Sequence, residues 1–105
     1  MTTESKVQPL ASLALTQPGA VVSRSLVKKA AGTVTAFAFD AGEGLSEHTT
    51  PYEALVIGVE GDAEIRIGSE AHRVQAGELL TLPANRPHAV RALTPFKMLL
   101  VMIRE

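Results

Sequence analysis

The chain has 105 residues, close to the commonest domain size, so one hydrophobic core is expected and a second independent domain is excluded. With 46% hydrophobic residues, 20% charged residues and a net charge of -1, the composition excludes a disordered chain. Ten basic residues scattered among eleven acidic ones argue against nucleic-acid binding. The absence of cysteine excludes disulfides, thiolate catalysis and thiolate-held zinc.

The N-terminal part differs in pattern from the rest. Its only apolar stretch, residues 10–15, is too short for the core of a signal peptide. No run in the sequence approaches the ~20 apolar residues that a membrane-spanning helix requires. We therefore treat residues 1–20 as an N-terminal extension, docked on the barrel or on a partner, and expect a cytoplasmic protein with no membrane interaction.

From Val21 onward, short apolar and β-branched runs alternate with Gly, Pro or Asn about every ten residues, which is typical of a β-sandwich or barrel. Gly68 and Ser69 form the loop of a tight hairpin. The sequence predicts an all-β domain over residues 21–105. Its nine expected strands lie near residues 21–27, 33–40, 45–50, 54–60, 63–67, 72–75, 79–82, 88–92 and 96–103.

Two of these strands, residues 54–59 and 98–103, are apolar on both faces. Only one face of a strand looks into a barrel, so the other face must be covered. Residues 8–27 of the same chain could supply the cover. A two-fold homodimer is the expectation that we prefer, because that symmetry lets one patch cover itself.

Two spaced motifs carry the functional argument. The first runs Gly42, five residues, His48, one residue, Thr50, three residues, Ala54, six residues, Gly61. The second runs Gly77, five residues, Pro83, one residue, Asn85, two residues, His88, three residues, Ala92. Together these motifs resemble the two motifs of the cupin family, and the resemblance covers about residues 33–103. It implies a single jelly-roll β-barrel of the RmlC-like, small one-domain type, with about nine strands.

The departures from the family pattern concern its metal ligands. The cupin motifs usually supply two His and one Glu from the first motif and one His from the second. Here Thr50 stands at the second His position and Ala54 at the Glu position, so only His48 and His88 remain. Glu53 lies one residue early, where strand alternation turns its side chain to the opposite face unless the loop at Pro51 delays the strand. Asn85 replaces a turn glycine, a mild change because Asn tolerates the left-handed conformation.

Two imidazoles in one pocket suit a divalent transition metal such as iron, manganese, nickel, copper or zinc, but two donors leave its shell incomplete and its binding weak. Glu53 is the candidate third ligand, with Tyr52, Glu47 or a bound substrate as alternatives. The expected pocket is lined by Thr50, Ala54, Val56 and Met98. The structural alternative is a pair of barrel-lining histidines that bond to each other, to water or to backbone. For His72 and for Phe37 and Phe39, packing roles are expected.

Three functions follow, and the sequence leaves open whether the protein is an enzyme. The resemblance implies a metal-binding cupin with oxygen- or peroxide-linked small-molecule chemistry. A metal-free barrel that binds a small molecule without catalysis is the second hypothesis. The third resembles the sugar-epimerase branch of the superfamily, with His48 or His88 as base and Tyr52 as acid.

Overall fold

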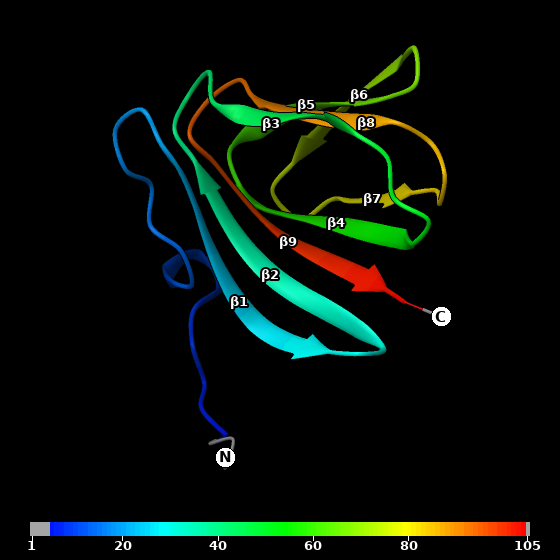
Figure 1. Cartoon of the computed structure of the whole chain (residues 1–105). Helices are drawn as coiled ribbons and strands as arrows, with labels where there is room; N and C mark the ends of the chain where they lie inside the picture. Colours follow the sequence, from blue (N-terminus) through cyan, green and yellow to red (C-terminus); the bar gives the residue numbers. More distant parts are fainter. Residues whose placement is uncertain (1–4, 105) are drawn as a thin grey trace.

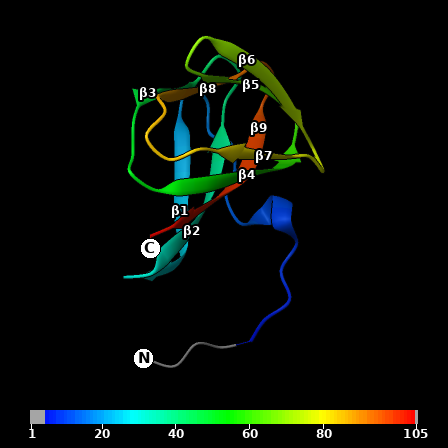
Figure 2. The same ribbon diagram turned by 90° about the vertical axis from the view of Figure 1, so that its right-hand side faces the viewer.

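The computed structural model describes residues 5–104, which form nine antiparallel strands in two packed sheets (Figures 1 and 2). A short 3₁₀ helix, η1 (Leu10–Ser12), precedes them. The strands are β1 (Val21–Lys29), β2 (Gly32–Phe39), β3 (Gly44–His48), β4 (Glu53–Glu60), β5 (Asp62–Ile67), β6 (Glu70–Gln75), β7 (Leu79–Leu82), β8 (His88–Ala92) and β9 (Phe96–Ile103). The predicted all-β jelly roll of nine strands is confirmed. Across these residues no helix has the length and apolar character needed to cross a membrane.

Strand order in both sheets departs from chain order. One sheet has the order β1-β2-β9-β4-β7 and the other β3-β8-β5-β6. Neighbours such as β2 with β9 and β3 with β8 are far apart in the chain, as in the double Greek key of a jelly roll. This crossover connectivity brings the two histidine-bearing motifs side by side, because β3 carries His48 of the first motif and pairs with β8, which carries His88 of the second.

All strand boundaries lie within two residues of their predicted positions. One of the two-residue differences is at β3, which ends at His48 rather than Thr50. The Thr50 hydroxyl donates to the carbonyl oxygen of Tyr52 and accepts from the Tyr52 amide, at 3.0 and 3.3 Å. This local turn, together with Pro51, competes with strand pairing and ends β3 early.

The main core fills the space between the sheets. Phe39, Phe96, Ile65, Met98 and Val56 are its largest fully buried side chains. Phe39 stacks between Phe37 and Phe96, with ring centroids 5.7 and 6.0 Å apart. The expected packing of Phe37 and Phe39 is therefore observed.

A second, smaller core lies on the outside of the five-stranded sheet. There Leu13 and Ala14 of the N-terminal segment pack on Ala36 and Ala38 of β2. The Lys97 ammonium, on a side chain that is 12% exposed, donates to the carbonyl oxygen of Ala11 at 2.7 Å. Residues 10–14 therefore cover part of the outer face of this sheet, as Figure 2 shows for η1 beside β4.

Candidate functional site

The site is built where β3 ends and β8 begins. These strands pair with His48 opposite His88, after an irregularity in β3 between Leu45 and His48. His88 alternates in phase with Val90 and Ala92, which are buried in the main core, so His88 points into the barrel and is only 7% exposed. His48 lies at the exposed mouth. The two motif histidines therefore share one site, half inside the barrel and half open to solvent.

The two imidazoles touch through their outer nitrogens. The Nε2 atoms are 3.0 Å apart, and the rings meet at 73° with centroids 4.3 Å apart. Each Nδ1 lies within hydrogen-bonding distance of a backbone carbonyl oxygen two residues earlier in the chain. His48 Nδ1 is 2.9 Å from the oxygen of Ser46, and His88 Nδ1 is 3.3 Å from the oxygen of Arg86.

These backbone contacts favour one tautomer of each ring. A carbonyl oxygen can only accept a hydrogen bond, so the two contacts favour a proton on each Nδ1. In neutral imidazole the other nitrogen, Nε2, then carries a lone pair. With both rings in this tautomer, two lone pairs face each other across 3.0 Å, an arrangement that one shared proton or one metal ion would stabilise.

The environment of His88 disfavours its own positive charge. Burial lowers the pKa of His88 below its usual value of 6.5, and the nearby charge of a protonated His48 lowers it further, while the Arg86 carbonyl opposes both effects. A positive charge on His48 therefore disfavours a second positive charge on His88. Near neutral pH, the lowered pKa keeps His88 in the neutral form that a metal requires.

The loops that hold the histidines are tied together. The amide of Asn85 donates to the carbonyl oxygen of Thr50 at 2.8 Å, and the amide of Gly68 donates to that of Pro87 at 2.8 Å. Asn85 has φ 65°, the left-handed conformation expected from its replacement of a motif glycine. These bonds fix the backbone on both sides of the imidazole pair.

The structure does not bring the candidate third ligands to the pair. β4 begins at Glu53, so Pro51 does not delay the strand, and Glu53 is exposed on the outer face while Ala54 points inward. The Arg104 guanidinium lies over the Tyr52 ring, with its Cζ atom 5.5 Å from the ring centroid. Tyr52 is thus paired with Arg104, and the described residues show no hydrogen bond from it to a histidine. Among residues 5–104, no three His, Asp or Glu side chains are grouped as a metal site, so Glu47 does not complete the shell either.

The residues expected to line the pocket occupy two environments. Ala54, Val56 and Met98 are buried in the main core, at most 3% exposed. Thr50 is half-buried, and its hydroxyl is engaged with Tyr52. The three apolar residues therefore pack the barrel interior, and Thr50 belongs to the loop at its mouth.

Sequence reasoning missed the carbonyl oxygens of Ser46 and Arg86. They orient both rings, yet they belong to the backbone, so no residue type signals them. The one regularity that could have indicated them is their position, because each carbonyl belongs to the residue two before its histidine. Carbonyl bonds to the free ring nitrogen are a common way to orient metal-binding histidines.

Comparisons with known proteins agree with this architecture. The profile of the cupin domain matches residues 36–103. A conserved protein of unknown function from Streptococcus pyogenes superposes with a TM-score of 0.93 and 34% identity, over 99% of this chain and 91% of that one. A cupin superfamily protein from Desulfitobacterium hafniense has a TM-score of 0.92 and 26% identity, over 98% and 94% of the two chains.

A cupin 2 conserved barrel domain protein from Leptotrichia buccalis is 39% identical over 83% of this chain but only 42% of its own length, with a TM-score of 0.80. No curated protein matches the chain significantly. The family profile spans most of the barrel, including both histidine motifs, and the most similar structures share the whole fold. This chain belongs to the cupin family.

Proposed function

We propose that this cupin binds a polar small molecule at the mouth of its barrel, through a divalent transition metal held weakly by His48 and His88. The observation that carries the proposal is the pair of Nε2 atoms 3.0 Å apart, with both Nδ1 atoms within hydrogen-bonding distance of backbone carbonyls. The ligand, together with water, supplies the donors that the chain lacks.

The donor set fits a metal in part. Neutral imidazole nitrogen suits zinc, iron, nickel and copper. Because metal–imidazole bonds are about 2.0–2.1 Å long, one ion can reach two nitrogens 3.0 Å apart. Two protein ligands are fewer than the three of catalytic zinc sites, and no carboxylate joins them among the described residues. We expect the two histidines to supply about half the binding free energy of a complete site. That free energy corresponds to a dissociation constant on the order of 1–200 μM.

A bound ion at this place would polarise a ligand oxygen and, if redox-active, support oxygen- or peroxide-linked chemistry. The chain's own residues do the rest. The carbonyls of Ser46 and Arg86 aim both Nε2 atoms at one point. The apolar interior beneath, with Val56 and Val90, excludes water from one side, so a ligand approaches from the exposed side at His48.

Metal titration tests the proposal. Purified protein, stripped with chelator, is titrated with zinc, nickel, manganese, iron or copper by calorimetry, and bound metal is counted by elemental analysis. We expect one site per chain, lost in both His48→Ala and His88→Ala. His72→Ala is the matched control, because His72 also lies in a strand but outside the pair, and its binding should equal that of the parent. Binding that survives both pair substitutions, or none in the parent, overturns the proposal.

The missing third donor favours one second candidate, a metal-free barrel that binds a small molecule directly. One proton between the two Nε2 atoms then satisfies the pair without a metal. A ligand at a hundred times its dissociation constant stabilises the protein by ~2.7 kcal/mol. Thermal shifts for a metabolite panel measured with excess chelator therefore support this candidate, and shifts that require added metal support the first.

The acid-base hypothesis has weaker support. His48 or His88 could accept a proton, but the described residues show no hydrogen bond between Tyr52 and either ring, and the Tyr52 ring packs against Arg104. We therefore do not propose epimerase-like catalysis.

A further inference from the structure

The inner face of the five-stranded sheet changes from polar to apolar across its width. Directly paired residues of neighbouring strands lie on the same face, so the strand register arranges this face in rows. The row at the His48 end of the barrel runs Lys28, Thr33, Met102 and Ala54, and the next row runs Ser25, Thr35, Leu100 and Val56. Each row is polar on β1 and β2 and apolar on β9 and β4. We call the four polar side chains, Ser25, Lys28, Thr33 and Thr35, the polar wall.

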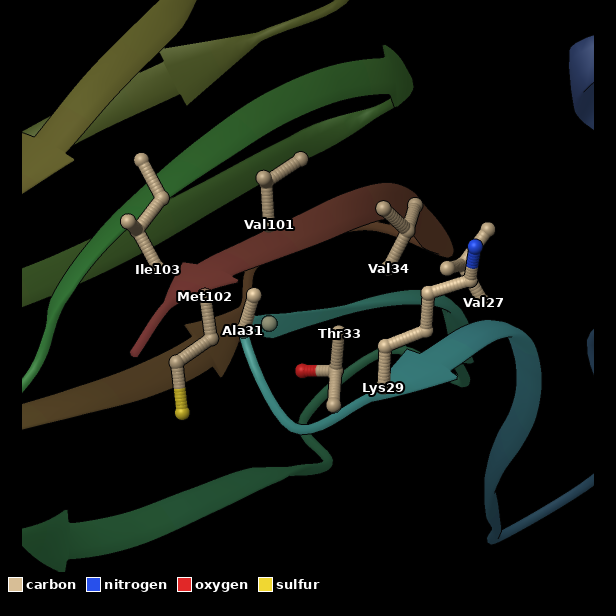
Figure 3. Close-up of a pocket in the computed structure, with 9 residues that line it drawn as sticks. Val27, Lys29, Ala31, Thr33, Val34, Val101, Met102 and Ile103 are labelled. Carbon is tan, nitrogen blue, oxygen red and sulfur yellow. The ribbon is translucent and has the colours of Figure 1, made fainter. Parts of the chain in front are cut away.

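The polar wall faces the interior of the barrel and is open to water. Figure 3 shows Thr33 and Met102 projecting on the side of the sheet opposite to Val34. Leu100 alternates in phase with Met102 and packs on the main core, so their side is the inner face. The four side chains of the polar wall are nevertheless half-buried or exposed. Interior positions of a small barrel are usually filled by packed side chains, so hydroxyl groups at these positions form a surface that can bind a polar ligand.

Two cations lie on the inner face at this end of the sheet. Lys28 stands at the β1 end of the first row. Arg104 follows β9, where alternation places it on the inner face, and its guanidinium lies over the Tyr52 ring. Both cations are exposed, and within residues 5–104 neither takes part in an ion pair. Of the neighbouring acids, Glu53 lies on the outer face, and Glu47 is the single carboxylate of β3.

We propose that the ligand of this site is a small hydroxycarboxylate, bound by the polar wall and Arg104. This inference rests on the proposed function, because it names the chemical class of the polar molecule that reaches the histidine pair. Lys28 and Arg104 start two strands apart, about 10 Å at ~4.8 Å per strand, a span that two long side chains can close around one carboxylate. The hydroxyls of Thr33 and Thr35 can both donate to and accept from the hydroxyl groups of the ligand.

The charges favour an acid over a neutral polyol. Hydrogen bonds from a cation to a carboxylate are stronger than those between neutral groups. A proton or a metal ion on the histidine pair adds further positive charge at the same end of the barrel. The polar wall alone would accept any polyol, so the preference for an acid depends on Lys28 and Arg104.

Three acids, each matched with the polyol of the same carbon skeleton, test the class. The pairs are D-glycerate with glycerol, L-tartrate with L-threitol, and D-gluconate with D-sorbitol. NMR titration of the parent measures each of them, first in metal-free protein and then with one equivalent of zinc. We expect at least one acid to bind metal-free protein with a dissociation constant on the order of 1 mM or below, at least about tenfold more tightly than its polyol. Its largest amide shifts should lie in β1, in β2 and at the end of β9.

Single substitutions identify the groups responsible. Lys28→Gln and Arg104→Gln should each weaken binding of the acid about three- to tenfold and leave the polyol unchanged. Lys29→Gln is the matched control, because it removes the same charge one residue along β1 but pairs with Gly32 in a row of the outer face, and its binding should equal that of the parent. Thr33→Val keeps the side-chain shape without the hydroxyl, and it should weaken acid and polyol alike. Thermal unfolding checks that each variant is folded.

Four results would overturn the inference: no acid bound, an acid and its polyol bound equally, Lys28→Gln and Lys29→Gln with the same affinity, or Arg104→Gln with the affinity of the parent. Zinc titration of the same samples tests the proposed metal site separately. Zinc binding together with any of those four results contradicts this inference alone. A preference for the acid that depends on Lys28 and Arg104 in a protein that does not bind zinc supports this inference and contradicts the metal site alone.

Discussion

Two glycines of the cupin motifs have almost the same backbone conformation but very different surroundings. Gly61 and Gly77 have φ of +79° and +83°. At Gly77 nothing lies within 4 Å of an added Cβ. At Gly61 an added Cβ would lie 1.9 Å from the carbonyl oxygen of Pro95 and 2.8 Å from the Thr94 hydroxyl. Substitution by alanine in each therefore separates conformational strain from steric overlap.

The expected losses differ by the overlap alone. The left-handed conformation costs alanine about 1–2 kcal/mol at both sites, so Gly77→Ala should lose about that much stability. In Gly61→Ala the Pro95 carbonyl must also move by more than an ångström. That movement strains the adjacent loop, where Thr94 Oγ1 accepts from the Asp62 amide and the Leu93 amide donates to the Asp62 carbonyl. The total should reach about 4 kcal/mol or more.

Thermal unfolding followed by circular dichroism measures both variants. At ~4–8 °C per kcal/mol for a domain of this size, thermal midpoints should fall by about 5–15 °C for Gly77→Ala and by at least 15 °C for Gly61→Ala. Equal losses in the two variants would refute the reasoning, because the difference rests only on the Pro95 contact. A larger loss at Gly77 would refute it more strongly.

Two further predictions concern His88 and Lys97. Because its folded-state pKa is lowered, His88 binds less proton in the folded chain than in the unfolded one, so stability should fall as pH decreases below about 6.5, by up to ~1.4 kcal/mol per pH unit. Urea unfolding in chelator at several pH values should show this slope reduced in His88→Gln, and an unchanged slope would contradict the assignment. Lys97→Met removes the hydrogen bond to the Ala11 carbonyl and the 3.3 Å ion pair with Glu60. Charge-assisted hydrogen bonds are worth about 1.5–3 kcal/mol, so amide exchange in residues 10–14 should accelerate at least about tenfold. Unchanged exchange there would show that Lys97 does not hold the segment.

The fold was largely predictable because its signals are local. Alternation and turn residues marked all nine strands, and motif spacing indicated that β3 and β8 meet. The outer surface was harder, since the apolar run 98–103 shows that a face needs covering but not by what. The structure shows Leu13 and Ala14 covering the rows around Ala36, which depends on packing between distant segments.

The site was predictable in its residues but not in its chemistry. The spacing placed His48 and His88 together, and alternation already favoured the outward direction of Glu53. The facing Nε2 atoms depend on ring orientation, which is set by the carbonyls of Ser46 and Arg86. Those carbonyl positions follow from the irregularity in β3 and the turn before β8, neither of which a residue type specifies.

The most direct test of the central claim is long-range ¹H–¹⁵N NMR of the histidine ring nitrogens at about pH 8, with and without one equivalent of zinc. At this pH, above the usual His pKa of ~6.5, we predict the Nδ1–H tautomer for both His48 and His88. Zinc should shift both Nε2 signals while those of His72 stay unchanged. If zinc leaves the signals of His48 and His88 unaltered, the proposed metal site is contradicted. If either ring carries its proton on Nε2 alone, the two lone pairs do not face each other, and the proposed site is contradicted as well.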